Sequence, residues 1–183
     1  MIIEDRSKNM KKRILLMAAA MMVVMASCHN QNQKTTQNDV QKAESALFNE
    51  DQTVNEAAAN EAVATFSKYA EENADASDAP EVLFKAVDIA VNMRHDAQQS
   101  IAMVERLVND YPTFDKNPVA LFMLAAFVYD EQLNDLDKAR ETYQRIIDNY
   151  PDSPFAADAA IAITQLGMTP EELIRMFEAQ EQE

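Results

Sequence analysis

The sequence has a single glycine, Gly167, among 183 residues. Phosphate-binding loops, dinucleotide-binding turns and tight hairpin turns all need glycines at fixed positions. The scarcity of glycine therefore excludes nucleotide sites of these kinds and a sheet built on tight hairpins. Alanine, glutamate, glutamine, leucine and methionine are abundant, and all of them favour helix. We predict an all-α chain.

Cysteine and histidine are almost as scarce, since the chain has only Cys28, His29 and His95. A catalytic triad or a metal site would need further ligands near a histidine, and neither histidine has them at suitable spacing. We expect His95 to be a solvated turn residue. Acidic pairs such as Glu171-Glu172 diverge on a helix and form a solvated face. We expect no catalytic residue, no metal and no cofactor; the alternative from the enzyme class is an accessory or degraded hydrolase domain.

Basic residues are also few: the chain has 16 of them against 31 acidic residues, which gives a net charge of −15. Without residues 1–27 the balance becomes 11 basic against 29 acidic residues, a net charge of −18. Such a surface repels phosphate backbones and anionic lipid headgroups. We therefore exclude nucleic acid as a partner, and any membrane attachment has to come from a lipid.

Cys28 ends a signal-like segment. The basic residues Lys11, Lys12 and Arg13 lead into the apolar run 14–26, which is shorter than the roughly 20 residues of a spanning helix. Met25-Ala26-Ser27-Cys28 resembles the bacterial lipobox, with methionine in place of the usual leucine. The resemblance implies that a lipid is attached to Cys28 and that residues 1–27 are removed. An uncleaved signal anchor is the alternative, and either Met1 or Met10 is the start.

Residues 28–52 are predicted to be a flexible polar tether, because 29–38 contain no large apolar side chain. A weak helical pattern at Val40, Ala43 and Leu47 interrupts it. A capping-box sequence at Thr53–Glu56 then marks the start of a helical repeat domain over 53–183.

The repeat becomes visible when the sequence is compared with itself at an offset of 39 residues. Tyr111-Pro112 then aligns with Tyr150-Pro151, and Asp96 with Asp135, each a candidate helix cap. The apolar and small positions that align are Leu83, Ala86, Val87 and Ala90 with Phe122, Ala125, Ala126 and Tyr129, and Ser100, Val104, Leu107 and Val108 with Ala139, Tyr143, Ile146 and Ile147. Upstream, an offset of 38 residues gives a half-repeat, in which Ala62, Phe66, Tyr69 and Ala70 align with Ser100, Val104, Leu107 and Val108. All six prolines fall at predicted helix boundaries.

The second repeat resembles the tetratricopeptide pattern of a bulky residue, an apolar-small pair and a tyrosine, followed by alanine, an aromatic residue and proline. These positions are Phe122, Ala125, Ala126, Tyr129, Ala139, Tyr143 and Pro151. The departures are a one-residue insertion in the Asp130–Asp135 turn, a longer linker between repeats, Ile146 in place of alanine and Asn134 in place of glycine. The resemblance implies a tetratricopeptide-like α-solenoid of antiparallel helix pairs; a helical bundle with a chance repeat and a HEAT-like pairing are the alternatives.

In the family that the repeat resembles, the first helices of the repeats line an inner face that receives a peptide or a partner helix. Carried over by position, the partner-binding candidates are Phe84, Asp88, Val91, Ala120, Met123, Phe127 and Asp130. Met123 and Phe127 fit the core equally well, because helix 118–130 is apolar on nearly every face.

Lipobox and repeat together are similar in layout to the lipid-anchored tetratricopeptide protein of the Bam complex and to periplasmic partners of the Tol–Pal system. We therefore expect a scaffold on the bacterial outer membrane that faces the periplasm and binds an envelope protein or peptide. A structural cell-surface lipoprotein is the alternative.

Overall fold

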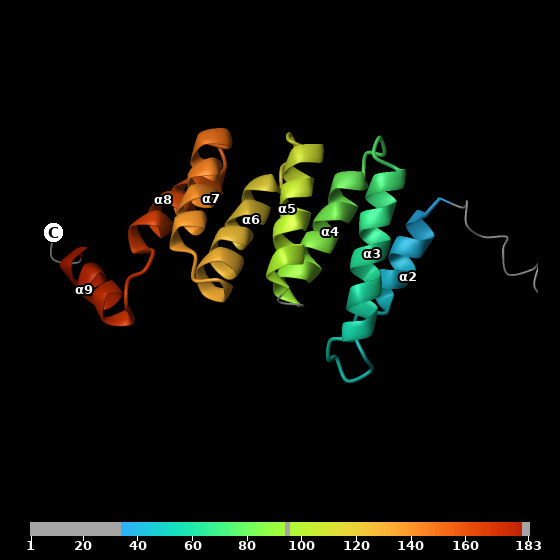
Figure 1. Cartoon of the computed structure of the whole chain (residues 1–183), viewed down its shortest axis with the longest axis horizontal. Helices are drawn as coiled ribbons and strands as arrows, with labels where there is room; N and C mark the ends of the chain where they lie inside the picture. The colour runs from blue at the N-terminus through green and yellow to red at the C-terminus, as the bar shows by residue number, and fades with distance from the viewer. Residues whose placement is uncertain (1–33, 94–95, 181–183) are drawn as a thin grey trace, which may run out of the picture. The chain divides into compact units, whose positions relative to one another are not determined.

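A computed structural model of the chain describes residues 34–93 and 96–180. From Thr35 onwards the chain forms one compact unit, and the regular elements in its described part are helices (Figure 1). They are α2 (Gln37–Ser45), α3 (Glu56–Glu72), α4 (Ala79–Asn92), α5 (Ala97–Asp110), α6 (Asn117–Met123), the π-helix η1 (Leu124–Gln132), α7 (Leu136–Asn149), α8 (Pro154–Gln165) and α9 (Pro170–Gln180). The predicted all-α class is confirmed.

Consecutive helices form hairpins that stack on one another. The hairpins are α2 with α3, α4 with α5, and α6 plus η1 with α7. The second helix of each hairpin also packs on the first helix of the next, in the pairs α3–α4, α5–η1 and α7–α8. This order of contacts is that of a tetratricopeptide-like array, as predicted.

The predicted repeat register is confirmed by burial. The small residues of the pattern are covered by neighbouring helices, and Ala86, Ala125 and Ala139 are fully buried. The larger residues of the pattern fill the space beside them, and buried members of both repeats and of the upstream half-repeat are Phe66, Leu83, Val87, Val104, Leu107, Tyr143 and Ile146. Asp96 and Asp135 cap α5 and α7, each accepting a hydrogen bond from the backbone N–H three residues on, at 3.0 Å.

The tyrosine of each Tyr-Pro pair links neighbouring hairpins. The Tyr111 hydroxyl donates to the carbonyl oxygen of Ala70 at 3.4 Å, and the Tyr150 hydroxyl donates to that of Pro112 at 3.4 Å. Both hydrogen bonds are long, so each contributes only modestly to stability. Each nevertheless gives a hydrogen-bond partner to a carbonyl of the preceding repeat, which explains why a tyrosine recurs at the repeat ends.

The predicted tether over 28–52 is too long. Residues 37–45 form α2, whose N-cap Thr36 and Asp39 make a capping box, and the side chains of Val40 and Leu47 are buried in the core against the neighbouring helices. The weak pattern at Val40, Ala43 and Leu47 is therefore a packed helix that completes the upstream hairpin. Residues 28–33, which include Cys28, lie outside the described part.

The one-residue insertion is accommodated within the helix, before the turn. Over η1 the backbone widens to the π form, and the Leu133 N–H donates to the Val128 carbonyl five residues earlier, at 2.9 Å. A π-helix holds more residues in each turn than an α-helix, so it takes up an extra residue without unfolding its neighbours. Asn134 then ends the segment at φ 51°, where the family pattern has glycine.

Deletion of Glu131, an exposed residue of η1, should remove this widening. We expect the segment to close to an α-helix with a loss of less than about 1 kcal/mol in the free energy of unfolding, because the following residues regain the ordinary family register. The measurement is the urea midpoint.

The matched control is deletion of Gln144, an exposed residue in the middle of α7. This deletion rotates the following residues by about 100° and moves Ile146 out of the core, at a cost of about 2–5 kcal/mol. Equal losses in the two variants would contradict the insertion account.

Candidate protein-binding surface

The first helices of successive hairpins lie next to one another. α4 contacts both α6 and η1, and α2 is joined to α4 by an ion pair between Glu44 and Lys85. The surface formed by α2, α4, α6 and η1 is called the inner face below. It corresponds to the face that the sequence predicts for partner binding.

A hollow of about 160 Å³ opens on the inner face between α2 and α4. Its lining is part apolar and part charged, and comprises Glu44, Leu47, Phe66, Glu81, Phe84, Lys85, Asp88, Ile89 and Met93. Two ion pairs stand at its rim, Lys85–Glu44 at 2.8 Å and Lys116–Glu81 at 2.6 Å. The four side chains are 34–47% exposed, so each pair is partly solvated and contributes at most about 1 kcal/mol to stability.

Phe84 is held in place on this face by its neighbours. Its ring meets Phe114 edge-on with centroids 6.2 Å apart, and the Lys116 ammonium lies 5.1 Å from the ring centroid. An aromatic ring fixed in this way, half-buried beside charged groups, is a surface on which a partner side chain can pack. The prediction placed Phe84 and Asp88 on the inner face, and the structure brings both into this hollow.

Three other predicted candidates are corrected by burial. Val91, Ala120 and Met123 lie in the core, with exposed fractions of 3%, 0% and 8%. Such side chains have no surface to offer a partner, because the helices of adjacent hairpins cover them. Sequence position alone puts them on the first helices but does not show how closely the neighbouring hairpin covers each one.

Phe127 is the exposed member of the predicted set. Its side chain is 43% exposed on η1, whereas Met123, one helical turn earlier, is buried. The repeat offset pairs Phe127 with Asp88, so the second repeat presents an aromatic ring where the first presents a carboxylate. Burial thus distinguishes Phe127 from Met123, which the sequence did not.

Asp130 lines a different hollow, of about 480 Å³, between η1, α7 and the α8–α9 connection. Tyr143 lines it too; its ring packs edge-on against Phe122, with centroids 5.2 Å apart. Burial raises the pKa of Tyr143 to about 12, and the carboxylates of Asp130 and Glu131 add to the shift. The phenol is therefore neutral at physiological pH and can donate or accept a hydrogen bond.

This larger hollow, called the end hollow below, is shaped by the only glycine of the chain. Gly167 adopts φ 77° after the end of α8, and an added Cβ would lie 2.9 Å from Leu136 Cδ1. The sequence did not predict the end hollow, because α8 and α9 lie beyond the best-matched repeat. The lone glycine after a helical pattern was the available signal.

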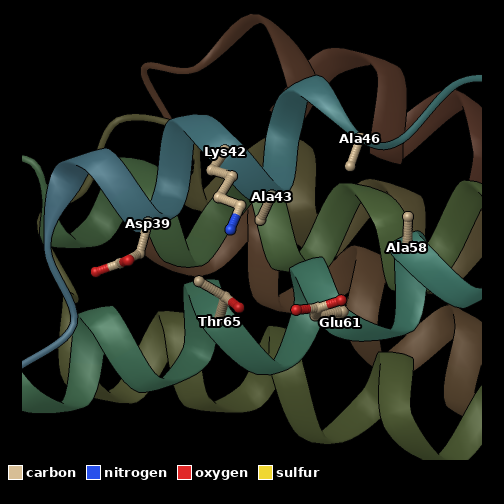
Figure 2. Close-up of a pocket in the computed structure, with 7 residues that line it drawn as sticks. All are labelled: Asp39, Lys42, Ala43, Ala46, Ala58, Glu61 and Thr65. Atoms are coloured by element: carbon tan, nitrogen blue, oxygen red, sulfur yellow. The ribbon is translucent and has the colours of Figure 1, made fainter. Parts of the chain in front are cut away.

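A third hollow lies between α2 and α3, where small alanines keep the helices close (Figure 2). Figure 2 shows Lys42 reaching from α2 toward α3, with Asp39 on the same helix and Glu61 and Thr65 opposite. These charged side chains are exposed, and the groove between them is open to solvent. It has no aromatic or enclosed polar group that would hold a ligand.

Within residues 34–93 and 96–180, no group of three His, Cys, Asp or Glu side chains is arranged to hold a metal ion. No helix in the same ranges is long and apolar enough to cross a membrane. The predicted lipid-attachment residue Cys28 and both histidines, His29 and His95, lie outside the described residues.

Comparison with known families agrees with this geometry. Residues 119–153 match the model of the tetratricopeptide repeat. This segment contains a tetratricopeptide repeat. It spans most of α6, all of η1 and α7, and the turn to α8, and its first helix contributes Phe127 to the inner face. A search of curated proteins found no match to the chain.

Burial predicts stability losses of different size for substitutions at Phe127 and at Met123. Phe127→Ala should lower the free energy of unfolding by less than about 1 kcal/mol, since its side chain is already 43% exposed. Met123→Ala should lower it by about 2–5 kcal/mol, because a buried side chain leaves a cavity. Chemical denaturation of both variants measures the difference. A larger loss for Phe127→Ala would show that this ring belongs to the core.

Proposed function

We propose that this protein is a lipid-anchored scaffold of the bacterial cell envelope that binds another protein through the inner face. The observation that supports the proposal most is the tetratricopeptide repeat over 119–153 within stacked hairpins. Such repeats commonly mediate protein–protein interactions, and an all-α fold of this type is typical of non-catalytic scaffolds.

The inner face has the mixed character of a protein-binding surface. Phe84 and Phe127 provide aromatic area, and an exposed or half-buried aromatic residue is a common energetic anchor in interfaces. Beside Phe84, Glu44 and Glu81 are paired with Lys85 and Lys116, so Asp88 is the carboxylate that favours a partner with a basic group. An envelope protein or peptide is the occupant that we propose, rather than nucleic acid.

The envelope location rests on the sequence around Cys28. The basic start, the apolar run 14–26 and the lipobox-like Met25–Cys28 support cleavage and lipid attachment. Two or three acyl chains would hold the protein on a membrane, because each buried methylene contributes about 0.8 kcal/mol. We place the protein on the periplasmic side of the outer membrane, with a layout like that of the Bam-complex and Tol–Pal proteins named above.

Labelling with radioactive palmitate in growing cells tests the anchor. The unaltered chain should incorporate label, and Cys28→Ala should incorporate none and lose its lipid-dependent attachment to the membrane fraction. Ser27→Ala is the matched control, since it keeps the cysteine and a small residue before the cleavage point. Absence of label in the unaltered chain would rule out the lipid anchor and leave the protein-binding role to stand on the repeat alone.

A further inference from the structure

The end hollow is lined by both polar and apolar side chains. Asp130, Asn134, Tyr143 and Gln165 supply the polar groups. The apolar members of the lining are Leu136, Ala162, Leu166, Met168 and Leu173. A volume of about 480 Å³ accommodates one long side chain of a partner together with part of its backbone.

Tyr143 has an unused hydroxyl in this hollow. The residue is only 3% exposed, and its hydroxyl makes no hydrogen bond to any residue in the described ranges. The Tyr129 hydroxyl also has no partner in these ranges, whereas Tyr69 bonds to Asp78, and Tyr111 and Tyr150 bond to backbone carbonyls. In the described residues, Asn117 Oδ1 is the only fully buried side-chain oxygen or nitrogen without a hydrogen-bond partner. The Tyr143 hydroxyl, which also lacks a partner, is therefore not fully buried. It keeps some access to solvent, on a residue that lines the hollow.

Asp130 lies on the same lining without a cationic partner. Three cations of α7 have other partners: Lys138 pairs with Glu141 at 2.6 Å, Arg145 pairs with Glu105 at 2.6 Å, and the Arg140 guanidinium donates to the Ile163 carbonyl at 3.4 Å. No ion pair joins Asp130 to a residue in the described part of the chain. A half-buried carboxylate and a nearly buried phenol thus line the same space, and both can accept a hydrogen bond from a cation.

We propose that the end hollow binds a lysine or arginine side chain of a bound protein segment. The ammonium or guanidinium group donates to the Asp130 carboxylate and to the Tyr143 hydroxyl oxygen, and the aliphatic stem packs on Leu136 and Leu166. Charge complementarity selects this occupant, because the chain carries a net charge of −15 and Glu131 lies beside the site. The inference rests on the proposed protein-binding role and names the chemistry of the partner.

The test uses three small probes on the full-length chain in detergent micelles at 150 mM salt. The probes are the N-acetyl methylamides of lysine, arginine and norleucine, the last being a neutral analogue with a similar stem. The readout is the NMR signal of 13C-labelled tyrosine rings, assigned to residue 143 through Tyr143→Phe. We expect the lysine and arginine probes to shift this signal saturably, with dissociation constants of ~1 mM, and norleucine to bind about tenfold more weakly.

Asp130→Asn should weaken binding of the cationic probes about tenfold. Asp158→Asn is the matched control, because Asp158 is an exposed carboxylate on α8 outside the lining; it should change binding less than twofold. Since Asp130→Asn could disturb η1, Tyr143→Phe gives a second variant that keeps the ring against Phe122 and removes only the hydroxyl. Probe shifts in backbone signals around Leu166 should weaken in this variant as well.

Equal binding of norleucine would overturn the proposal by showing an apolar site without cation recognition. Equal weakening in Asp158→Asn would overturn it in favour of a diffuse charge effect, and absence of any shift would overturn it outright. None of these results bears on the inner face, since the probes need no partner protein. Failure here is therefore distinguishable from failure of the scaffold role.

Discussion

No hairpin in this chain can bury its apolar surface by itself, and the rest of the structure depends on that constraint. Leu83 on α4, Leu121 on α6 and Leu124 on η1 are fully buried only because neighbouring hairpins cover them. The hairpins must therefore stack in order, which places first helices beside first helices and second helices beside second helices. The inner face and the end hollow both follow from this stacking, as surfaces where the stacked helices leave side chains exposed or a space unfilled.

Much of this arrangement could be predicted from the sequence, because stacking imposes local requirements that recur at a fixed spacing. Close helix approaches require small residues such as Ala86 and Ala125, and helix starts require caps such as Asp96 and Asp135. The tyrosines before Pro112 and Pro151 recur because each reaches a carbonyl of the preceding repeat. These features lie within one or two turns of helix, so a single sequence reveals them.

The features that the sequence did not reveal depend on neighbours distant along the chain. Met123 and Phe127 are alike in hydrophobicity and spacing, but only the stacked helices decide that the first is buried and the second exposed. The helix at Gln37–Ser45 carries few apolar residues and is fixed by contacts with α3. The end hollow joins Asp130 and Tyr143 to residues of α8 and α9 that lie outside the recognisable repeat.

The central claim, that the inner face binds a protein, is tested most directly by site-specific photocrosslinking in living cells. A benzophenone amino acid would replace Phe127 or Asp88 on the inner face, and Gln144, exposed on α7, as the control. Mass spectrometry would identify the crosslinked proteins. The account predicts that one protein is captured from both inner-face positions and not from Gln144. Capture from Gln144 alone, or equal capture from all three positions, would contradict it.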